Sequence, residues 1–325
     1  MLSPSIAPID HPDAQSMLWP TGDQAIAIDW LLSLMHWVCG LMYALVVAGV
    51  LALLWRAWRA RTHPRTRVSE RSLQLAFRGW IVLTVAGIVV LTLASFLVDR
   101  QLLSAAPADL TIRINGRQWW WRIEYRDADP QRSFITANEL HLPVARTAHI
   151  ELLSDDVIHS FWVPQLAGKR DMIPGRLNTL EVTPRQTGTF RGTCAEFCGL
   201  QHAKMGLVVV VENDADFARW RSRQAQTAMV PAARPAIEGA QVFASAQCAS
   251  CHSVRGTYAG SEQGPDLTHL ASRATLAAGA LPLDAPSLDA WISDPQRHKP
   301  GTLMPTIALE PAQRDALVAY LLALE

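Results

Sequence analysis

The segment that constrains the structure most strongly is Cys194-Ala-Glu-Phe-Cys198-Gly-Leu-Gln-His202-Ala-Lys-Met205, preceded far upstream by His159. Two thiols, two imidazoles and a thioether form a soft, nitrogen- and sulfur-rich donor set that suits copper. Because His159 comes from a different part of the chain, such a site would tie two parts of the fold together. A mononuclear blue-copper site needs only one Cys, so the second thiolate favours a pair of copper ions bridged by sulfur. An exported disulfide between Cys194 and Cys198 is the alternative.

A second cofactor motif lies near the C-terminus, where residues 248–252 read Cys-Ala-Ser-Cys-His. C-x-x-C-H is the attachment signature of c-type haem. The thiols of Cys248 and Cys251 would form thioether bonds to the haem, and His252 would supply one axial nitrogen. A zinc-binding or redox-active C-x-x-C is disfavoured, because the chain has no second C-x-x-C for zinc and no βαβ pattern around the motif.

The second axial haem ligand is expected farther along the chain. We predict Met304, in the sequence Gly301-Thr-Leu-Met-Pro, because a thioether ligand raises the reduction potential relative to two histidines. His298 and His269 are the competing candidates.

The composition sets the broad class of protein. The chain has 325 residues, which suggests two or three domains, and half of its residues are apolar. Its 29 basic and 29 acidic residues balance, so the net charge gives no support to nucleic-acid binding. Five cysteines are too few for a disulfide scaffold, and four of them belong to the two motifs above.

Two long apolar runs precede these motifs. Residues 30–55 and 80–98 contain no formal charge, and each is long enough to cross a hydrocarbon core of about 30 Å as a helix. We therefore predict a two-helix transmembrane hairpin, the alternative being two buried helices of a soluble core.

The charges around these runs predict the orientation. The hairpin loop and its flanks are rich in arginine against the single acid Glu70: Arg56, Arg59, Arg61, Arg65, Arg67, Arg71 and Arg78. The charged residues before the first run are all acidic: Asp10, Asp13, Asp23 and Asp29. The positive-inside rule then places the loop in the cytoplasm and both chain ends outside, with the first span acting as an uncleaved insertion signal.

The region after the hairpin changes pattern. Short alternating or β-branched runs predict strands of a β-sandwich at residues 110–115, 118–125, 149–153, 157–163, 179–183 and 207–211. Helical patterns follow at residues 236–247, 287–293 and 311–324. We divide the chain into a tail and hairpin (1–100), a sandwich (101–220), a linker (221–235) and a C-terminal domain (236–325).

The motifs together resemble cytochrome c oxidase subunit II with a fused class I cytochrome c. The spacing C-x-E-x-C-x-x-x-H-x-x-M after an upstream H-S-F-W-V-P is that of the dinuclear CuA centre. The resemblance implies a membrane-anchored multidomain fold: a two-helix hairpin, a cupredoxin-like β-sandwich and an all-α cytochrome c domain. In the cytochrome c domain, the helix that contains Gly239 and Phe243 would pack across the terminal helix that contains Tyr320.

The resemblance also implies residue roles. Cys194 and Cys198 would bridge both coppers, and His159 and His202 would be terminal ligands. The weak ligands would be Met205 on one copper and the Glu196 carbonyl on the other. The Glu196 carboxylate would help to hold a magnesium ion at the junction with subunit I.

The aromatic run Gln118-Trp-Trp-Trp121 resembles the family's Q-W-[aromatic]-W motif, whose first tryptophan lies on the electron entry route to CuA. Trp119 is the candidate for this role, whereas Trp120 and Trp121 fit strand packing at least as well.

The implied function is electron transfer within a proton-pumping haem–copper oxidase, from haem c to CuA and on to subunit I, where oxygen is reduced to water. This chain then has no oxygen-reducing site and no catalytic acid or base of its own. The implied partners are subunits I and III, small subunits, and a donor such as a soluble or membrane cytochrome c or a quinol–cytochrome c reductase. The implied location is the bacterial inner membrane, with both cofactor domains on the periplasmic side.

The start of the second span departs from the pattern of the family. Many family members carry a Glu near the start of the second span, whereas residues 76–80 offer none and Glu70 lies about two turns earlier.

A thioredoxin-like copper-delivery protein also uses two cysteines and a histidine, but the order and spacing here argue against it. A nitrous-oxide reductase and a quinol-oxidising relative are disfavoured by the chain length and by the retained cysteines.

Overall fold

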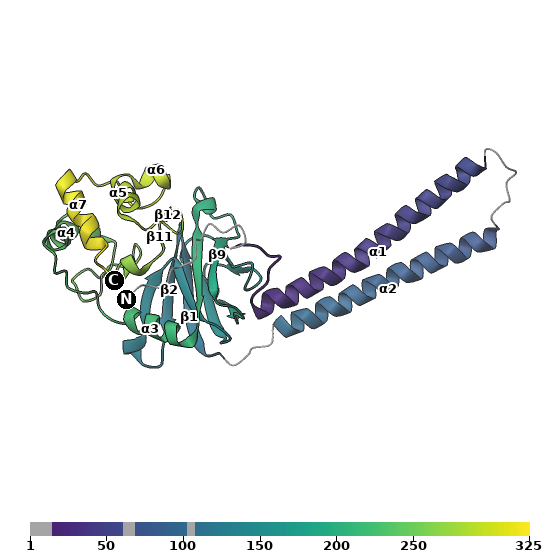
Figure 1. Cartoon of the computed structure of the whole chain (residues 1–325), viewed down its shortest axis with the longest axis horizontal. Helices are drawn as coiled ribbons and strands as arrows, with labels where there is room; N and C mark the ends of the chain where they lie inside the picture. The colour runs from purple at the N-terminus through teal and green to yellow at the C-terminus, as the bar shows by residue number, and fades with distance from the viewer. Residues whose placement is uncertain (1–14, 61–68, 103–107) are drawn as a thin grey trace. The chain divides into compact units, whose positions relative to one another are not determined.

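The computed structural model describes residues 15–60, 69–102 and 108–325 (Figure 1). The chain separates into two compact units, one formed by the helical hairpin and the other by the sandwich and the C-terminal domain.

Some residues used to predict the membrane orientation lie outside the described residues: Asp10, Asp13, Arg61, Arg65 and Arg67.

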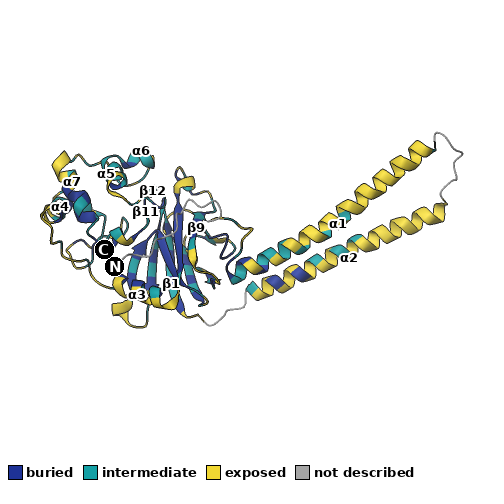
Figure 2. Ribbon diagram, viewed as in Figure 1, coloured by how far each residue is buried: buried dark blue, intermediate teal, exposed yellow. Residues whose placement is uncertain are grey.

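The hairpin consists of α1 (Asp23–Arg59) and α2 (Glu70–Leu102). These helices contain the two predicted spans, and their 37 and 33 residues correspond to lengths of about 55 and 50 Å. Both helices are therefore longer than the hydrocarbon core of a bilayer. Their apolar side chains are largely exposed (Figure 2), as expected for a lipid-facing surface and not for a soluble core. Glu70 is the first residue of α2.

The sandwich is built from two five-stranded sheets. The first has the order β3-β2-β1-β5-β8 and the second the order β4-β10-β9-β6-β7. The strands are β1 (Leu110–Arg117), β2 (Trp120–Arg126), β3 (Phe134–Ala137), β4 (Glu139–Pro143), β5 (Ala148–Ser154), β6 (His159–Trp162), β7 (Arg170–Met172), β8 (Asn178–Val182), β9 (Gly188–Cys194) and β10 (Gly206–Glu212). All six predicted strands are present, and β3, β4, β7 and β9 are additional.

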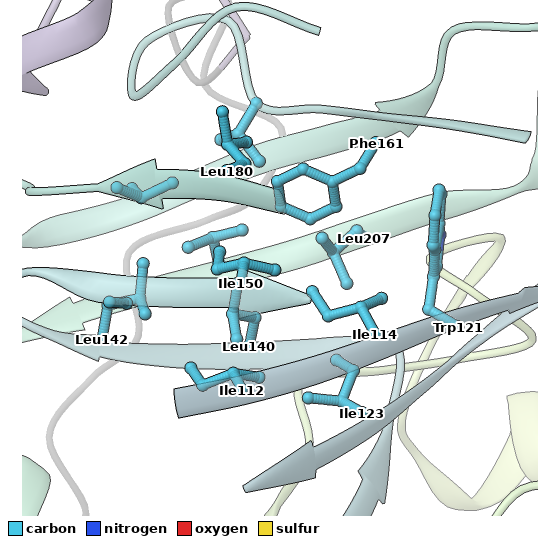
Figure 3. Close-up of a cluster of buried hydrophobic side chains, with 14 of the residues drawn as sticks. Ile112, Ile114, Trp121, Ile123, Leu140, Leu142, Ile150, Phe161, Leu180 and Leu207 are labelled. Atoms are coloured by element: carbon cyan, nitrogen blue, oxygen red, sulfur yellow. The ribbon is translucent and has the colours of Figure 1, made fainter. Parts of the chain in front are cut away.

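Alternating burial explains why the sheets pack face to face. In β1 and β5 every second side chain is buried, so one face of each strand faces the core and the other is partly solvated. Figure 3 shows Ile112, Ile114, Ile150 and Phe161 meeting between the sheets. Trp121 packs edge-on against Phe161, with ring centroids 6.1 Å apart.

The chain leaves the sandwich through α3 (Asp214–Gln224), a helix that the sequence analysis did not predict. The Asn213 side chain caps it by accepting a hydrogen bond from the Asp216 amide at 3.0 Å. Phe217 and Trp220 are buried in the sandwich core. Residues 221–224 of the expected linker therefore belong to this helix.

The C-terminal domain has its own hydrophobic core and is mainly helical. Its elements are α4 (Arg234–Ser245), three-residue 3-10 turns at Cys248–Ser250 and Leu270–Ser272, a small hairpin of β11 (Thr275–Leu276) and β12 (Leu281–Pro282), α5 (Ala285–Ser293), α6 (Pro295–His298) and α7 (Pro311–Leu321). The three predicted helices correspond to α4, α5 and α7.

Helices α4 and α7 cross in close contact. Phe243 and Tyr320 meet with ring centroids 5.6 Å apart, as the resemblance implied. Gly239 lies at the crossing, where a Cβ atom would collide with the carbonyl oxygen of Ala316. The absence of a side chain at this position therefore sets how closely the two helices approach.

We expect Gly239→Val to destabilise the C-terminal domain, because the added side chain would force the helices apart. Overpacking of this kind costs about 1–3 kcal/mol. Thermal unfolding of the full chain, followed at the haem absorption, should show the loss. Gly260→Ala is the control, because a Cβ at Gly260 would meet no atom within 4 Å. Equal melting temperatures for the two variants would contradict this account of the crossing.

Candidate metal centres

The predicted copper ligands meet at one end of the sandwich. Strand β9 ends at Cys194 and β10 begins at Gly206, and we call residues 194–205 the copper loop. The Cys194 amide donates to the Met205 carbonyl at 3.0 Å, which closes the loop at its base. His159 begins β6, which pairs with β9 so that Phe161 faces Cys194 across the ladder.

The donor atoms of the loop lie close together. Cys194 Sγ is 3.7 Å from Cys198 Sγ and 3.9 Å from His159 Nδ1. Cys198 Sγ is 3.7 Å from His202 Nδ1 and 3.8 Å from Met205 Sδ. Both cysteines are buried and free, so the disulfide alternative does not describe this structure. The structure thus brings together all five side chains that the sequence nominated, and their donor types fit copper.

Glu196 contributes two different groups. Its carbonyl oxygen lies 3.2 Å from Cys194 Sγ, within the cluster of predicted ligands. Its carboxylate accepts a hydrogen bond from the Phe197 amide at 3.3 Å.

The two thiols differ in proton affinity. The hydrogen bond with Cys198 holds the pKa of Cys194 down to about 3. The same contact, together with burial, raises the pKa of Cys198 above its ordinary value. Copper binding by both sulfurs would require each thiol to lose its proton.

Asp156 orients the His159 ring, a role that the sequence analysis did not assign. Its carboxylate lies 2.7 Å from His159 Nε2 and accepts a hydrogen bond from the Gln118 amide at 2.7 Å. Burial alone would lower the pKa of His159, but the hydrogen bonds with Asp156 and Cys194 raise it to about 9. The contact with Asp156 leaves Nδ1 directed at Cys194. The signal in the sequence was an acidic residue three positions before a candidate ligand.

The tryptophan run lies directly beside the copper loop. The Trp119 indole N–H donates to the Cys198 carbonyl at 2.9 Å, and the Gln118 side-chain Nε2 donates to the same oxygen at 2.7 Å. Trp119 is only 7% exposed. Trp121 is fully buried in the sandwich core and Trp120 is half-buried, as expected for packing residues.

The haem attachment motif follows α4 directly. Cys248 and Cys251 are partly exposed, and the short 3-10 turn Cys248–Ser250 separates them by one turn. The His252 Nδ1 is 2.8 Å from the Pro265 carbonyl, so Nε2 is the nitrogen left to bind iron. Burial lowers the pKa of His252 and favours the neutral imidazole that a metal requires.

The structure also separates the candidates for the second axial ligand. His269 is buried, and its two ring nitrogens are engaged by the carbonyls of Gln226 and Glu325, at 3.1 and 2.6 Å. Met304 lies half-buried in a bend of the irregular segment between α6 and α7. These contacts argue against His269 and leave Met304 as the prediction, with His298 as its remaining competitor.

Comparison with known proteins assigns the family. A profile of the cytochrome c oxidase subunit II periplasmic domain matches residues 127–212, and a profile of cytochrome c matches residues 236–325. The probable cytochrome c oxidase subunit 2 of Rickettsia bellii is 30% identical over 193 residues, which cover 54% of this chain and 71% of that protein. The chain belongs to the cytochrome c oxidase subunit II family.

Other relatives match over different lengths. The cytochrome c oxidase subunit 2 of Alkalihalophilus pseudofirmus is 35% identical over 215 residues, 66% of this chain. The chain covers 61% of that relative's length. The solved periplasmic domain of subunit II from Bradyrhizobium japonicum is 34% identical, with a TM-score of 0.35, and the match covers 37% of this chain and 96% of that one.

The two family matches fit the donor atoms of the two sites. The subunit II domain implies copper, and the copper loop offers the sulfur and nitrogen atoms that copper prefers. The cytochrome c profile implies haem, and it spans the C-x-x-C-H motif and Met304.

We expect Asp156→Ala to weaken copper binding by about 10–100-fold, because the His159 ring would lose the carboxylate that orients it. Copper retained per chain after competition with a chelator measures the effect. Asp155→Ala is the matched control, since the Asp155 carboxylate accepts from Asn115 and Arg117 and not from a ligand. Equal copper retention in the two variants would show that Asp156 does not orient the ligand.

We expect Met304→Ala to lower the haem reduction potential and to abolish the weak near-infrared sulfur–iron band, because the iron would lose its thioether ligand. Redox titration and absorption spectroscopy measure both effects, with His298→Ala as the comparison. If His298→Ala removes the low-spin haem spectrum and Met304→Ala does not, His298 is the ligand.

Proposed function

We propose that this chain is the electron-carrying subunit of a proton-pumping haem–copper oxidase. It would accept electrons at haem c, pass them to CuA and deliver them to subunit I, where oxygen is reduced to water. The observation that carries the proposal is that the copper loop and the C-x-x-C-H motif lie in one compact unit. When bound, the haem iron and the copper pair each take up and release one electron.

The ligand roles are part of this proposal. Cys194, Cys198, His159 and His202 would hold the copper pair. Met205 and the Glu196 carbonyl are the weak ligands. Cys248 and Cys251 would attach the haem, and His252 and Met304 would bind its iron.

The protein around the copper loop suits a carrier. Cys194, Cys198 and Met205 are each at most 3% exposed, so the chain excludes water from the sulfur atoms. A backbone hydrogen bond holds the loop at Cys194, and a hydrogen bond from the Trp119 indole holds it at the Cys198 carbonyl. Ligands fixed in this way move little when the charge on the site changes, which keeps electron transfer fast.

Trp119 is proposed as the residue through which electrons reach the copper loop. The hydrogen bond from its indole to the Cys198 carbonyl supports this role, because it joins the ring directly to a copper-ligating residue.

The cellular setting is also proposed. The helical hairpin would anchor the chain in the bacterial inner membrane with both cofactor domains on the periplasmic side. Subunits I and III and small subunits would be partners in the complex, and the Glu196 carboxylate would share a magnesium ion with subunit I. A cytochrome c or a quinol–cytochrome c reductase would be the donor. The domain limits at 1–100, 101–220, 221–235 and 236–325 remain a proposal.

We expect Cys194→Ser in the assembled oxidase to leave reduction of the haem by the donor intact and to stop oxygen consumption, because the second bridging thiolate is lost. Stopped-flow absorption and an oxygen electrode measure the two steps. Cys39→Ser is the matched control, since Cys39 belongs to neither motif.

Continued oxygen consumption in Cys194→Ser would mean that electrons reach subunit I without this copper site. Copper electron paramagnetic resonance of the parent chain gives a second check. A mixed-valence pair gives a multi-line signal, whereas a simple four-line signal would contradict the paired site.

A further inference from the structure

One buried lysine lies between the two cofactor domains. The chain has three lysines, and whereas Lys169 and Lys204 are exposed, Lys299 is only 3% exposed. It caps the C-terminal end of α6, in the segment that leads to Met304. Its position so close to the copper loop was not predictable from either motif.

The Lys299 ammonium group binds backbone oxygens from both domains. Nζ donates to the Trp119 carbonyl of the sandwich at 2.8 Å and to the Ala277 carbonyl of its own domain at 3.1 Å. No carboxylate forms an ion pair with it among residues 15–60, 69–102 and 108–325. Burial, reinforced by the charge of Lys204, lowers the pKa of Lys299 to about 7. A cation buried without an acidic partner costs free energy, so the contact calls for a reason beyond stability.

Trp119 joins this lysine to the copper loop. Its carbonyl accepts from Lys299, and its indole N–H donates to the Cys198 carbonyl at 2.9 Å. A short series of hydrogen bonds and covalent bonds therefore runs from the C-terminal domain to a predicted copper ligand.

Neighbouring contacts hold the same segment against the copper loop. The Gln201 side chain donates to the Pro300 carbonyl at 2.7 Å, and Lys204 donates to the His298 carbonyl. Gly301 has φ +86°, and a Cβ there would lie 3.0 Å from Leu200 and 3.7 Å from the Trp119 ring. A side chain at Gly301 would therefore be both strained and crowded. We call residues 298–301 the docking segment.

We propose that Lys299 is the positioning residue that seats the docking segment on Trp119 and thereby sets the rate at which electrons cross from the C-terminal domain to the copper loop. The inference rests on the proposed function, since it assumes that the two centres exchange electrons. In that step one electron would pass from the reduced haem to the oxidised copper pair. No proton is transferred, and no bond is formed or broken. Lys299 acts through Trp119, whose carbonyl accepts its hydrogen bond.

The test is Lys299→Met in the full chain loaded with haem and copper, with Lys169→Met as the matched control. The haem is reduced rapidly by a photochemical donor, and its reoxidation by copper is followed by absorption. We expect the rate in Lys299→Met to fall about tenfold, as for the loss of charge-assisted hydrogen bonds, with unchanged spectra and midpoint potentials. Lys169→Met should match the parent chain.

Three results would overturn the proposal. The rate in Lys299→Met could equal that of the parent chain while both cofactors are present. The rate could fall together with a shift in the copper reduction potential that is large enough to explain the slower rate. Lys299 would then act through its charge and not as a positioning residue. Both Lys299→Met and Lys299→Gln could fail to retain haem and copper, which would make Lys299 a folding residue. If the parent chain itself transfers no electron from haem to copper, the proposed function fails instead.

Discussion

The antiparallel pairing of β6 with β9 is the constraint on which the copper site depends. It sets Phe161 opposite Cys194, at the base of the copper loop. His159 lies two residues before Phe161 and so shares its face of the strand. A slip of one residue would turn the His159 ring to the opposite face and separate it from the thiols. The register is fixed by the core, because Phe161 is 1% exposed and packs edge-on against Trp121.

The contacts around the copper loop follow from that register. The loop returns to its own base through the bond from the Cys194 amide to the Met205 carbonyl. The Cys198 carbonyl, near its middle, accepts hydrogen bonds from both Gln118 and Trp119. These bonds join the backbone of the copper loop to itself and to the side chains of Gln118 and Trp119. The ligands are thereby preorganised, which lowers the cost of binding and reduces motion on electron transfer.

The sequence predicted the elements that carry a strong local signal. The two apolar runs were found because each is long and uncharged, and β1 was found because its side chains alternate in character. Strand β9 was missed because two of its buried positions are the small residues Gly192 and Cys194. Helix α3 was missed because its Arg- and Gln-rich end resembles a linker, although Trp220 anchors it. The copper ligands could be nominated from spacing, whereas the contact of Lys299 with Trp119 joins residues 180 positions apart and needs the tertiary fold.

The covalent link between the two domains explains the character of their contact. A tether raises the effective concentration of one domain at the other to the millimolar range, so the interface need not supply high affinity. The contacts accordingly include polar bonds that involve backbone atoms, such as those from Lys299 to Trp119 and from the Ala274 amide to the Glu139 carboxylate at 2.8 Å, beside the side-chain ion pair of Arg122 with Glu262 at 3.1 Å. Backbone acceptors have fixed directions, which makes such bonds suited to orientation. In the proposed role this is the useful property, because the rate of electron transfer depends on how the centres are placed and not on how tightly the domains bind. Since Trp119 is only 7% exposed, a separate donor protein would, in the proposed function, deliver its electron to the haem of the C-terminal domain and not to the Trp119 ring.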